Sequence, residues 1–378
     1  MSVTNCRVCG QKFFDEALLQ FKNMPKSAQY FPDSHLLNED NGVDLDVFQC
    51  SGCGLIQLSN YPVPYYKEVI RAAGISAEMS EFRKNQFKEF VDKYSLWNKR
   101  VIEIGSGKGE FLSIMKTFVE DTSGIEYSNE SVEHCKSLGL NVSEEYIDNC
   151  NIQLSNSPFD AFFILNFLEH MPEPNVVLSG IYNNLTDDGV GLVEVPNFDM
   201  IISCNLFSEF INDHLFYFTK DSLTSLLNLN GFEIISLNIV WHGYIISAEV
   251  RKRKQIDLSS FYKSQLSLTN ELSEYIYRFE SGKIAVWGAG HQALAVLSLT
   301  GISEKIKYVI DSAQFKQNKY TPATHLPVYA PDILQSDPVD AVIIMAASYS
   351  DEVARIIRQQ FNNNIQISIL RDYGLEIL

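Results

Sequence analysis

The chain of 378 residues has no apolar run long enough to cross a lipid bilayer, although 46% of its residues are hydrophobic. Its first residues do not combine a basic stretch with an apolar one, so we expect no secretory signal. Cations are scarce, because 30 lysines and arginines face 47 aspartates and glutamates, which gives a net charge of −17. Since nucleic-acid binding depends on cations that neutralise phosphates, this balance disfavours a nucleic-acid partner. We expect a cytoplasmic protein of two to three domains, without membrane contact.

Basic residues form a single dense run, Arg-Lys-Arg-Lys at 251–254. A phosphate site is one interpretation of such a run. The alternative that we favour is a solvated strand end that leads into a linker.

Cysteine is sparse as well, but four of the seven cysteines form two short pairs, Cys6-x-x-Cys9 and Cys50-x-x-Cys53. In a reducing compartment such pairs favour a tetrahedral four-cysteine zinc site, and a redox-active pair is the alternative. Four thiolates fill the coordination shell of the metal, so this zinc would be structural. The remaining cysteines are expected in the core: Cys135, Cys150 and Cys204.

Residues 101–112 have the pattern of a buried strand, a Gly-x-Gly-x-Gly turn and a helix start. Glu110 stands where a dinucleotide site would have its third glycine. Glu103 lies inside the strand and suits a cationic ligand, and S-adenosylmethionine carries a sulfonium and an ammonium group. The next strand ends at Glu126, about 20 residues further, where a carboxylate meets ribose hydroxyls in doubly wound folds. The predicted residues of this S-adenosylmethionine site are Glu103, Gly105, Ser106, Gly107, Gly109, Glu126, Tyr127, Asn166 and Phe167. A nucleotide-like fold without a cofactor is the alternative.

Strands and helices alternate from residue 100 onward, which predicts a parallel sheet with crossover helices. The expected strands are 100–104, 122–126, 159–165 and 189–195, followed by a closing pair at 232–240 and 243–250. We therefore predict an α/β protein with a class I, Rossmann-like methyltransferase core, an N-terminal zinc ribbon and a C-terminal Rossmann-like domain. The predicted parts are a zinc-binding module (1–60), a helical bridge or cap (61–98), the methyltransferase domain (99–254), a connecting helix (255–281) and the C-terminal domain (282–378).

Two histidines and a second glycine turn add candidate functional residues. His170 follows the strand at 159–165, at the sheet edge where ligands bind, and either contacts a ligand or structures its loop. His214 belongs to an aromatic insertion at 196–220. The Gly-x-Gly turn at 288–290 leaves two interpretations open, a nucleotide site or a shared fold.

Together these features resemble the three-part sugar C-methyltransferases of deoxysugar pathways. Such enzymes combine an N-terminal zinc-binding module, an S-adenosylmethionine domain and a C-terminal Rossmann-like domain. The matching landmarks are the two cysteine pairs, the turn at 103–109, residues 166–172, Asp311 and residues 322–328. The resemblance covers nearly the whole chain. It implies methylation of a carbon next to a ketone on a nucleotide-linked sugar, without a catalytic metal.

The active-site signature of that family resembles Tyr-x-Glu-His-x-x-Tyr-Phe and falls on residues 211–218. His214 matches, Asp213 replaces the glutamate, and Ile211 replaces the first tyrosine and so removes a hydroxyl. His214, with an ordinary pKa of about 6.5, is the candidate base, and Asp213 would orient it. Tyr217 or a backbone N–H would then stabilise the enolate.

The C-terminal domain departs from the family as well. Gln292 stands where the family has a lysine, and Ala347 and Ser348 replace a Trp-Asn pair. Because these positions lie in regions that the family uses for substrate, other functions remain open. They are O- or N-methylation of another small molecule, methylation of RNA, which the net charge disfavours, and a binding module without catalysis.

Overall fold

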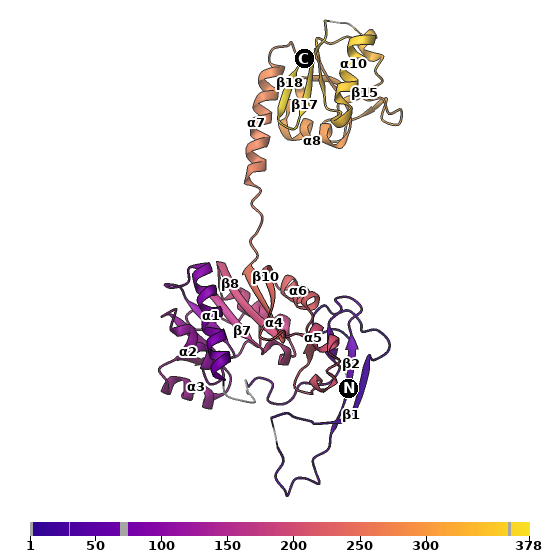
Figure 1. Ribbon diagram of the computed structural model, residues 1–378. Coiled ribbons are helices and arrows are strands. Elements are labelled where there is room, and N and C mark those ends of the chain that lie inside the picture. Colours follow the sequence, from indigo (N-terminus) through magenta and orange to yellow (C-terminus); the bar gives the residue numbers. More distant parts are fainter. Residues whose placement is uncertain (1–2, 30, 69–74, 362–363) are drawn as a thin grey trace. The chain divides into compact units, whose positions relative to one another are not determined.

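The structure is a computed structural model that describes residues 3–29, 31–68, 75–361 and 364–378 (Figure 1). The chain forms two compact units, residues 1–254 and residues 255–378. None of the helices in the described ranges combines the length and apolar character that a membrane span requires.

The first unit is built on a seven-stranded sheet with the order β10-β11-β8-β7-β4-β5-β6. Its strands are β4 (Val101–Ile104), β5 (Thr122–Glu126), β6 (Asn141–Glu144), β7 (Phe159–Leu165), β8 (Leu185–Pro196), β10 (Phe232–Val240) and β11 (Ile245–Lys252). Strands β4 to β8 are parallel, whereas β11 runs antiparallel to β8 and to β10. The direction of strand order reverses between β4 and β7, so the loops after these two strands open a crevice where ligands bind in such sheets. The α/β class and the predicted strands are confirmed, and β6 is an additional strand.

Helices cover both faces of this sheet. Successive residues of each strand point to opposite faces, so each strand contributes side chains to both helix layers. Ala161 and Phe163 of β7 pack with one helix layer, and Phe162 and Ile164 pack with the other. The first layer is α1 (Ala77–Tyr94), α2 (Glu110–Lys116) and α3 (Asn129–Ser137), and the second contains α4 (Pro174–Asn183) and α6 (Lys220–Leu229). Short helices follow β7 and β8, namely η1 (Leu168–His170), α5 (Phe198–Ser203) and η2 (Phe207–Glu209).

Helix α1 carries a fully buried ion pair to the sheet. Arg83 Nη1 lies 2.5 Å from Glu194 Oε2, and both side chains are 0% exposed. Gln86 donates to the other carboxylate oxygen over 2.5 Å. The pair therefore fixes α1 over the carboxyl end of β8.

Replacing Arg83 with methionine is expected to destabilise the first unit by about 3–5 kcal/mol, because it leaves the Glu194 charge buried and uncompensated. Urea denaturation of the two proteins measures the difference. The double variant Arg83→Met, Glu194→Leu removes both charges and should recover much of the loss. A single variant as stable as the wild-type protein would contradict the expectation.

The N-terminal residues form a second, smaller sheet with the order β1-β2-β3-β9. Its strands are β1 (Leu19–Met24), β2 (Val43–Gln49), β3 (Ile56–Leu58) and β9 (Phe216–Tyr217). Strand β9 comes from the aromatic insertion, so the insertion completes the sheet of the N-terminal module. Cys6, Val8, Cys50 and Leu55 also share the buried cluster of the central sheet. The structure thus holds residues 1–254 together as one unit, and the finer division into three parts stays a prediction.

The second unit contains another seven-stranded sheet, with the order β14-β15-β13-β12-β16-β17-β18. Its strands are β12 (Ile284–Trp287), β13 (Ile306–Ile310), β14 (Lys319–Tyr320), β15 (Pro327–Tyr329), β16 (Ala341–Ile344), β17 (Gln366–Arg371) and β18 (Gly374–Ile377). The five inner strands are parallel and the two edge strands are antiparallel, as expected for a Rossmann-like domain. Its helices are α7 (Ser259–Ile276), α8 (His291–Thr300), η3 (Ile302–Lys305), α9 (Ile333–Ser336), η4 (Ala347–Tyr349) and α10 (Ser350–Gln360). The predicted connecting helix is α7, and it buries Leu272, Tyr275 and Ile276 within this unit.

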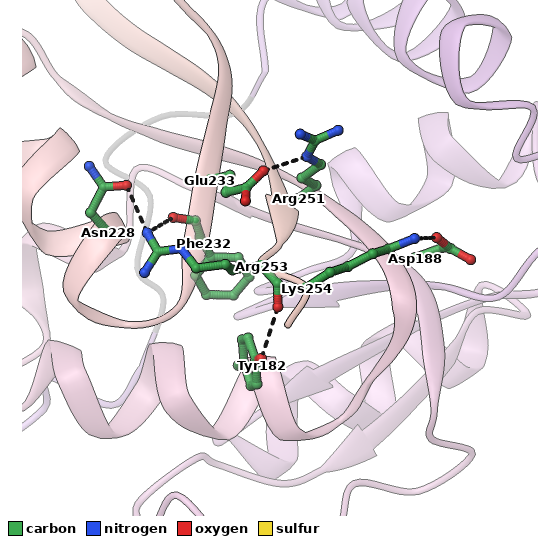
Figure 2. Close-up of polar contacts among 8 residues, drawn as sticks. All are labelled: Tyr182, Asp188, Asn228, Phe232, Glu233, Arg251, Arg253 and Lys254. Atoms are coloured by element: carbon green, nitrogen blue, oxygen red, sulfur yellow. Dashed lines mark hydrogen bonds and ion pairs between the residues drawn. The ribbon is translucent and has the colours of Figure 1, made fainter. Parts of the chain in front are cut away.

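The basic run at 251–254 lies at the end of β11, and its side chains contact other residues of the first unit (Figure 2). Arg251 donates to Glu233 over 2.7 Å, and Lys254 pairs with Asp188. Lys252 donates to the backbone carbonyl of Leu185, and Arg253 donates to that of Phe232. These contacts support the interpretation as a strand end. Two of the isolated cysteines differ from expectation: Cys135 is buried, whereas Cys150 and Cys204 are exposed.

Candidate active site

The glycine-rich loop after β4 is attached to the end of β5. Glu126 accepts hydrogen bonds from the backbone N–H groups of Gly107 (2.9 Å) and Ser128 (3.0 Å). The N–H groups of Gly105 and Ser106 both donate to one carbonyl of β5 over 3.0 Å. Burial raises the pKa of Glu126, and the backbone N–H groups oppose that shift. The carboxylate therefore shapes the loop, besides its predicted contact with a ribose.

Glycine is required by packing at two positions around this loop. Gly109 has a φ of +80°, and a Cβ atom there would lie 2.4 Å from Leu140 Cδ1. A Cβ atom on Gly124 of β5 would lie 2.0 Å from Ser106 Oγ. The close fit of loop, strand and helix depends on these glycines, whatever the loop binds.

Several predicted cofactor residues line one narrow pocket, among them Gly105, Glu126, Tyr127 and Phe167. Lys67 stands over it, with its Nζ atom 5.1 Å from the ring centroid of Tyr127. Lys67 belongs to the predicted bridge, whose role as a cap over the cofactor stays a prediction. Glu103 is buried in β4, at 2% exposure.

A larger cavity of about 630 Å³ lies over the carboxyl edge of the sheet. Its wall contains Asn166 and Phe167 after β7, residues of segments 63–68 and 75–79, and residues of the turn between β10 and β11. Asp213 and His214 of the insertion line it too. The cavity therefore brings the predicted catalytic insertion to the predicted cofactor residues.

Asp213 organises one side of this cavity, but with partners that differ from the predicted one. Its carboxylate accepts hydrogen bonds from the Tyr65 hydroxyl (2.6 Å) and from the backbone N–H of Ala28 (3.0 Å). Its backbone carbonyl lies 2.9 Å from His170 Nδ1. Asp213 thus positions Tyr65 and His170, whereas we predicted that it would orient His214.

The two histidines meet edge to face, with ring centroids 4.6 Å apart. A carbonyl oxygen can only accept, so His170 Nδ1 carries a proton and, in the neutral ring, Nε2 is the basic atom. Burial lowers the pKa of His170, and burial together with the nearby His170 lowers the pKa of His214 to about 3. Both imidazoles are therefore neutral near pH 7. His170 is a cavity residue as well as a loop-structuring one.

Tyr217, the predicted donor to an enolate, lies in a different environment. It is 4% exposed and packs against Phe210, with ring centroids 4.7 Å apart. Its hydroxyl accepts from the N–H of Ile211 over 3.0 Å and donates to the carbonyl of that residue over 3.3 Å. Tyr217 is not among the described residues that line the cavity. Its geometry supports the fold of the insertion, and its catalytic role stays a prediction.

Several polar residues of the cavity wall were not predicted from the sequence, and Tyr65 and Glu169 are among them. Glu169 precedes His170 in η1 and is 1% exposed, and burial raises its pKa to about 8. Its position in the loop after the strand at 159–165 was a usable signal. Nothing in the local sequence marks it as buried.

The four paired cysteines come together at one point. Cys6 Sγ lies 3.7 Å from Cys53 Sγ, and Cys9 Sγ lies 3.3 Å from Cys50 Sγ. All four sulfurs lie within 4.8 Å of one another. A tetrahedral zinc with Zn–S bonds of about 2.3 Å requires sulfurs about 3.8 Å apart. The cluster is therefore compatible with the predicted zinc ribbon.

In the C-terminal unit, the glycine turn at 288–290 packs closely against neighbouring residues of the same unit. A Cβ atom on Gly288, whose φ is +119°, would lie 2.4 Å from the carbonyl oxygen of Met345. Asp311 accepts from the N–H of Ala289 and pairs with Lys316, both over 2.8 Å. In a nucleotide site the Asp311 carboxylate would contact a ribose, but here it is paired with Lys316. This favours the interpretation that the turn reflects a shared fold and not a nucleotide site.

Family comparisons agree with this architecture. Residues 79–237 match the family described as a methyltransferase domain, and residues 252–369 match the family described as the C-methyltransferase C-terminal domain. The C-methyltransferase NovU of Streptomyces niveus is 21% identical, and the match covers 93% of this chain and 91% of that protein. A ubiquinone biosynthesis O-methyltransferase of Paraburkholderia phymatum is 31% identical over 24% of this chain and 41% of its own length.

Solved structures show weaker likeness. The plantazolicin methyltransferase BpumL in complex with SAH has a TM-score of 0.38 at 15% identity, over 47% of this chain and 86% of that one. An S-adenosylmethionine-dependent methyltransferase from Clostridium acetobutylicum has a TM-score of 0.40 at 13% identity, over 50% and 96%.

The two family matches and the sheet order define an S-adenosylmethionine-dependent methyltransferase. More particularly, the chain carries the C-methyltransferase C-terminal domain and resembles NovU over nearly its whole length, at low identity. The predicted resemblance to the C-methyltransferases is therefore confirmed.

Proposed function

We propose that this enzyme methylates the carbon next to the ketone of a nucleotide-linked keto-sugar, with His214 as the general base. The observation that carries the proposal is the pair of neutral histidines on the wall of the large cavity, beside residues of the predicted cofactor site. The C-methyltransferase C-terminal domain and the likeness to NovU support a carbon acceptor. A ketone makes the proton on the adjacent carbon removable, so a base in this position has a specific task.

Bound S-adenosylmethionine supplies an activated methyl group, and Glu103, Glu126 and the loop at 105–109 would hold it. The chain must then position the acceptor and remove its proton. His214, neutral because of its burial, accepts that proton. His170, oriented by the Asp213 carbonyl, lies edge to face with it and is a second candidate for the base.

Burial also limits the reaction, because a pKa of about 3 makes protonation of His214 costly in the ligand-free cavity. An enolate forming next to the imidazolium would offset that cost through charge pairing. The site consequently needs a group that holds the enolate oxygen.

The test is proton exchange without the methyl donor. Incubated in D₂O with a nucleoside-diphosphate-linked 4-keto-6-deoxyhexose, the enzyme should exchange deuterium into the position next to the ketone, as followed by proton NMR. With the donor added, a carbon-bound methyl group should appear at the same position. Methyl transfer to oxygen or nitrogen without exchange would instead establish the competing O- or N-methylation.

We further infer that Cys6, Cys9, Cys50 and Cys53 hold one structural zinc ion. Backbone N–H groups point at two of the sulfurs, from Val8 to Cys6 over 3.4 Å and from Gly52 to Cys50 over 3.3 Å. Such contacts stabilise thiolates, the form that binds zinc.

A further inference from the structure

Glu169 is a buried acid on the wall of the large cavity, and the reaction steps described above do not use it. It lies in η1, four residues after the end of β7, and its backbone carbonyl accepts from the N–H of Leu215 over 2.9 Å, which fixes η1 against the insertion. The residue is 1% exposed and lines the cavity. Within the described part of the chain, its Oε2 atom has no hydrogen-bond partner. Its Oε1 atom lies 4.0 Å from His170 Nε2.

No lysine or arginine of the described residues forms an ion pair with Glu169. The buried guanidinium of Arg83 is used by Glu194. The titratable groups that face Glu169 are His170, His214 and Tyr244. Burying an unpaired carboxylate costs far more free energy than burying a carboxylic acid, so the neutral acid is the stable form here. The raised pKa, about 8, agrees with this argument from geometry.

We propose that Glu169 is protonated at neutral pH and donates a hydrogen bond to the carbonyl oxygen of the substrate as that oxygen becomes an enolate. This inference rests on the proposed C-methylation. It gives Glu169 the role of the group that stabilises the enolate, a role for which Ile211 offers no hydroxyl.

The spacing of the groups fits this task. The nearest ligand atoms of Glu169, His170 and His214 all lie within 4.8 Å of one another. A ketone oxygen and its neighbouring carbon are about 2.4 Å apart, from standard bond lengths. Given a hydrogen bond of about 2.7 Å and a base about 3 Å from the carbon, one C–C=O unit can lie across the acid and the base.

The proton and electron balance is simple. A histidine nitrogen takes the proton from the carbon, the C–H electron pair becomes the C=C bond, and the carbonyl π electrons move to the oxygen that Glu169 holds. The enolate carbon then bonds to the methyl carbon, and the pair of the broken S–CH₃ bond stays on sulfur. The ketone re-forms, Glu169 keeps its proton, and the histidine releases its own to solvent.

A divalent cation held by Glu169, His170 and His214 is the competing use of the same side chains. Metal–ligand bonds of about 2.1 Å place neighbouring ligand atoms about 3.0–3.4 Å apart. The Glu169–His170 separation of 4.0 Å is wider, so the geometry favours the acid.

Infrared spectroscopy of the ligand-free enzyme tests the protonation state directly. At pH 7 the wild-type protein should show the C=O band of a protonated carboxylic acid, and Glu169→Gln should lack it. The matched control is Glu173→Gln, an exposed glutamate four residues further on, which should retain the band. Absence of the band in the wild type, or its survival in Glu169→Gln, overturns the proposal.

Kinetics test the role in the reaction. Deuterium exchange into the keto-hexose probe should fall about 10²–10³-fold in Glu169→Met, and less in Glu169→Gln, whose amide still donates. Affinity for S-adenosylhomocysteine should stay unchanged in both variants, which also reports their folding. Full exchange in Glu169→Met overturns the proposal, as does Mn²⁺ binding that Glu169→Gln abolishes. If the wild type itself shows no exchange, the proposed function fails, and the infrared band alone decides the state of Glu169.

Discussion

Replacing Cys50 with serine is expected to abolish zinc binding and to unfold the N-terminal module. Structural zinc in small cysteine sites contributes binding free energies of about 10–16 kcal/mol, which the fold loses with the metal. Cys50 and Leu55 belong to the same buried cluster as residues of the central sheet, so the damage should extend to that sheet. Elemental analysis should give one zinc per chain for the wild-type protein and none for the variant. Calorimetry should show a lower melting temperature.

Cys204→Ser provides the matched control, because Cys204 is exposed and remote in sequence from the cluster. It should retain both the metal and the melting temperature. A Cys50→Ser protein that keeps its zinc, or that melts like the wild type, would refute the assignment of a four-cysteine site.

Replacing His214 with alanine is expected to lower methyl transfer and deuterium exchange about 10²–10⁴-fold, the usual contribution of a general base. Binding of S-adenosylhomocysteine, measured by calorimetry, should remain within about twofold, because the predicted cofactor loop is a separate element. His242→Ala is the control, since that exposed histidine pairs with Glu78 and is not among the described residues that line the cavity. His170→Ala distinguishes the two rings, and the larger loss identifies the base. Exchange that survives in His214→Ala but vanishes in His170→Ala would transfer the role to His170.

The pH dependence gives the same hypothesis a second test. Burial lowers the pKa of His214 to about 3, and a lowered pKa keeps the neutral, proton-accepting form present down to that pH. Exchange should therefore show no loss with a midpoint near 6.5 as the pH falls from 8 to 5. A midpoint near 6.5 would indicate a solvated histidine as the base.

Local sequence patterns predicted the strands and the glycine loop well, because these features depend on neighbouring residues. The run of apolar residues before Gly105 and the turn spacing are sufficient for a strand that ends in a loop. Strand β6 was missed because Asn141–Glu144 is short and largely polar. Strand β9, with two residues, is defined only by its pairing with β3.

The candidate site was predictable as a set of residues but not as a set of contacts. Asp213 meets Tyr65, 148 residues away along the chain, and Ala28, 185 residues away. Such pairings arise from tertiary packing and leave no spacing signal in a single sequence. Likewise, Glu169 has the appearance of an ordinary loop acid until the fold buries it.

The shared sheet of β3 and β9 has a consequence for how this enzyme can be dissected. A fragment that begins at α1 would retain every strand of the central sheet. It would lose β3, the strand that pairs with β9 of the insertion. It would also lose the hydroxyl and the amide that hold Asp213 in place. Donor recognition could survive such a truncation while acceptor chemistry disappears, so the smallest catalytically competent piece must include the cysteine-rich beginning of the chain.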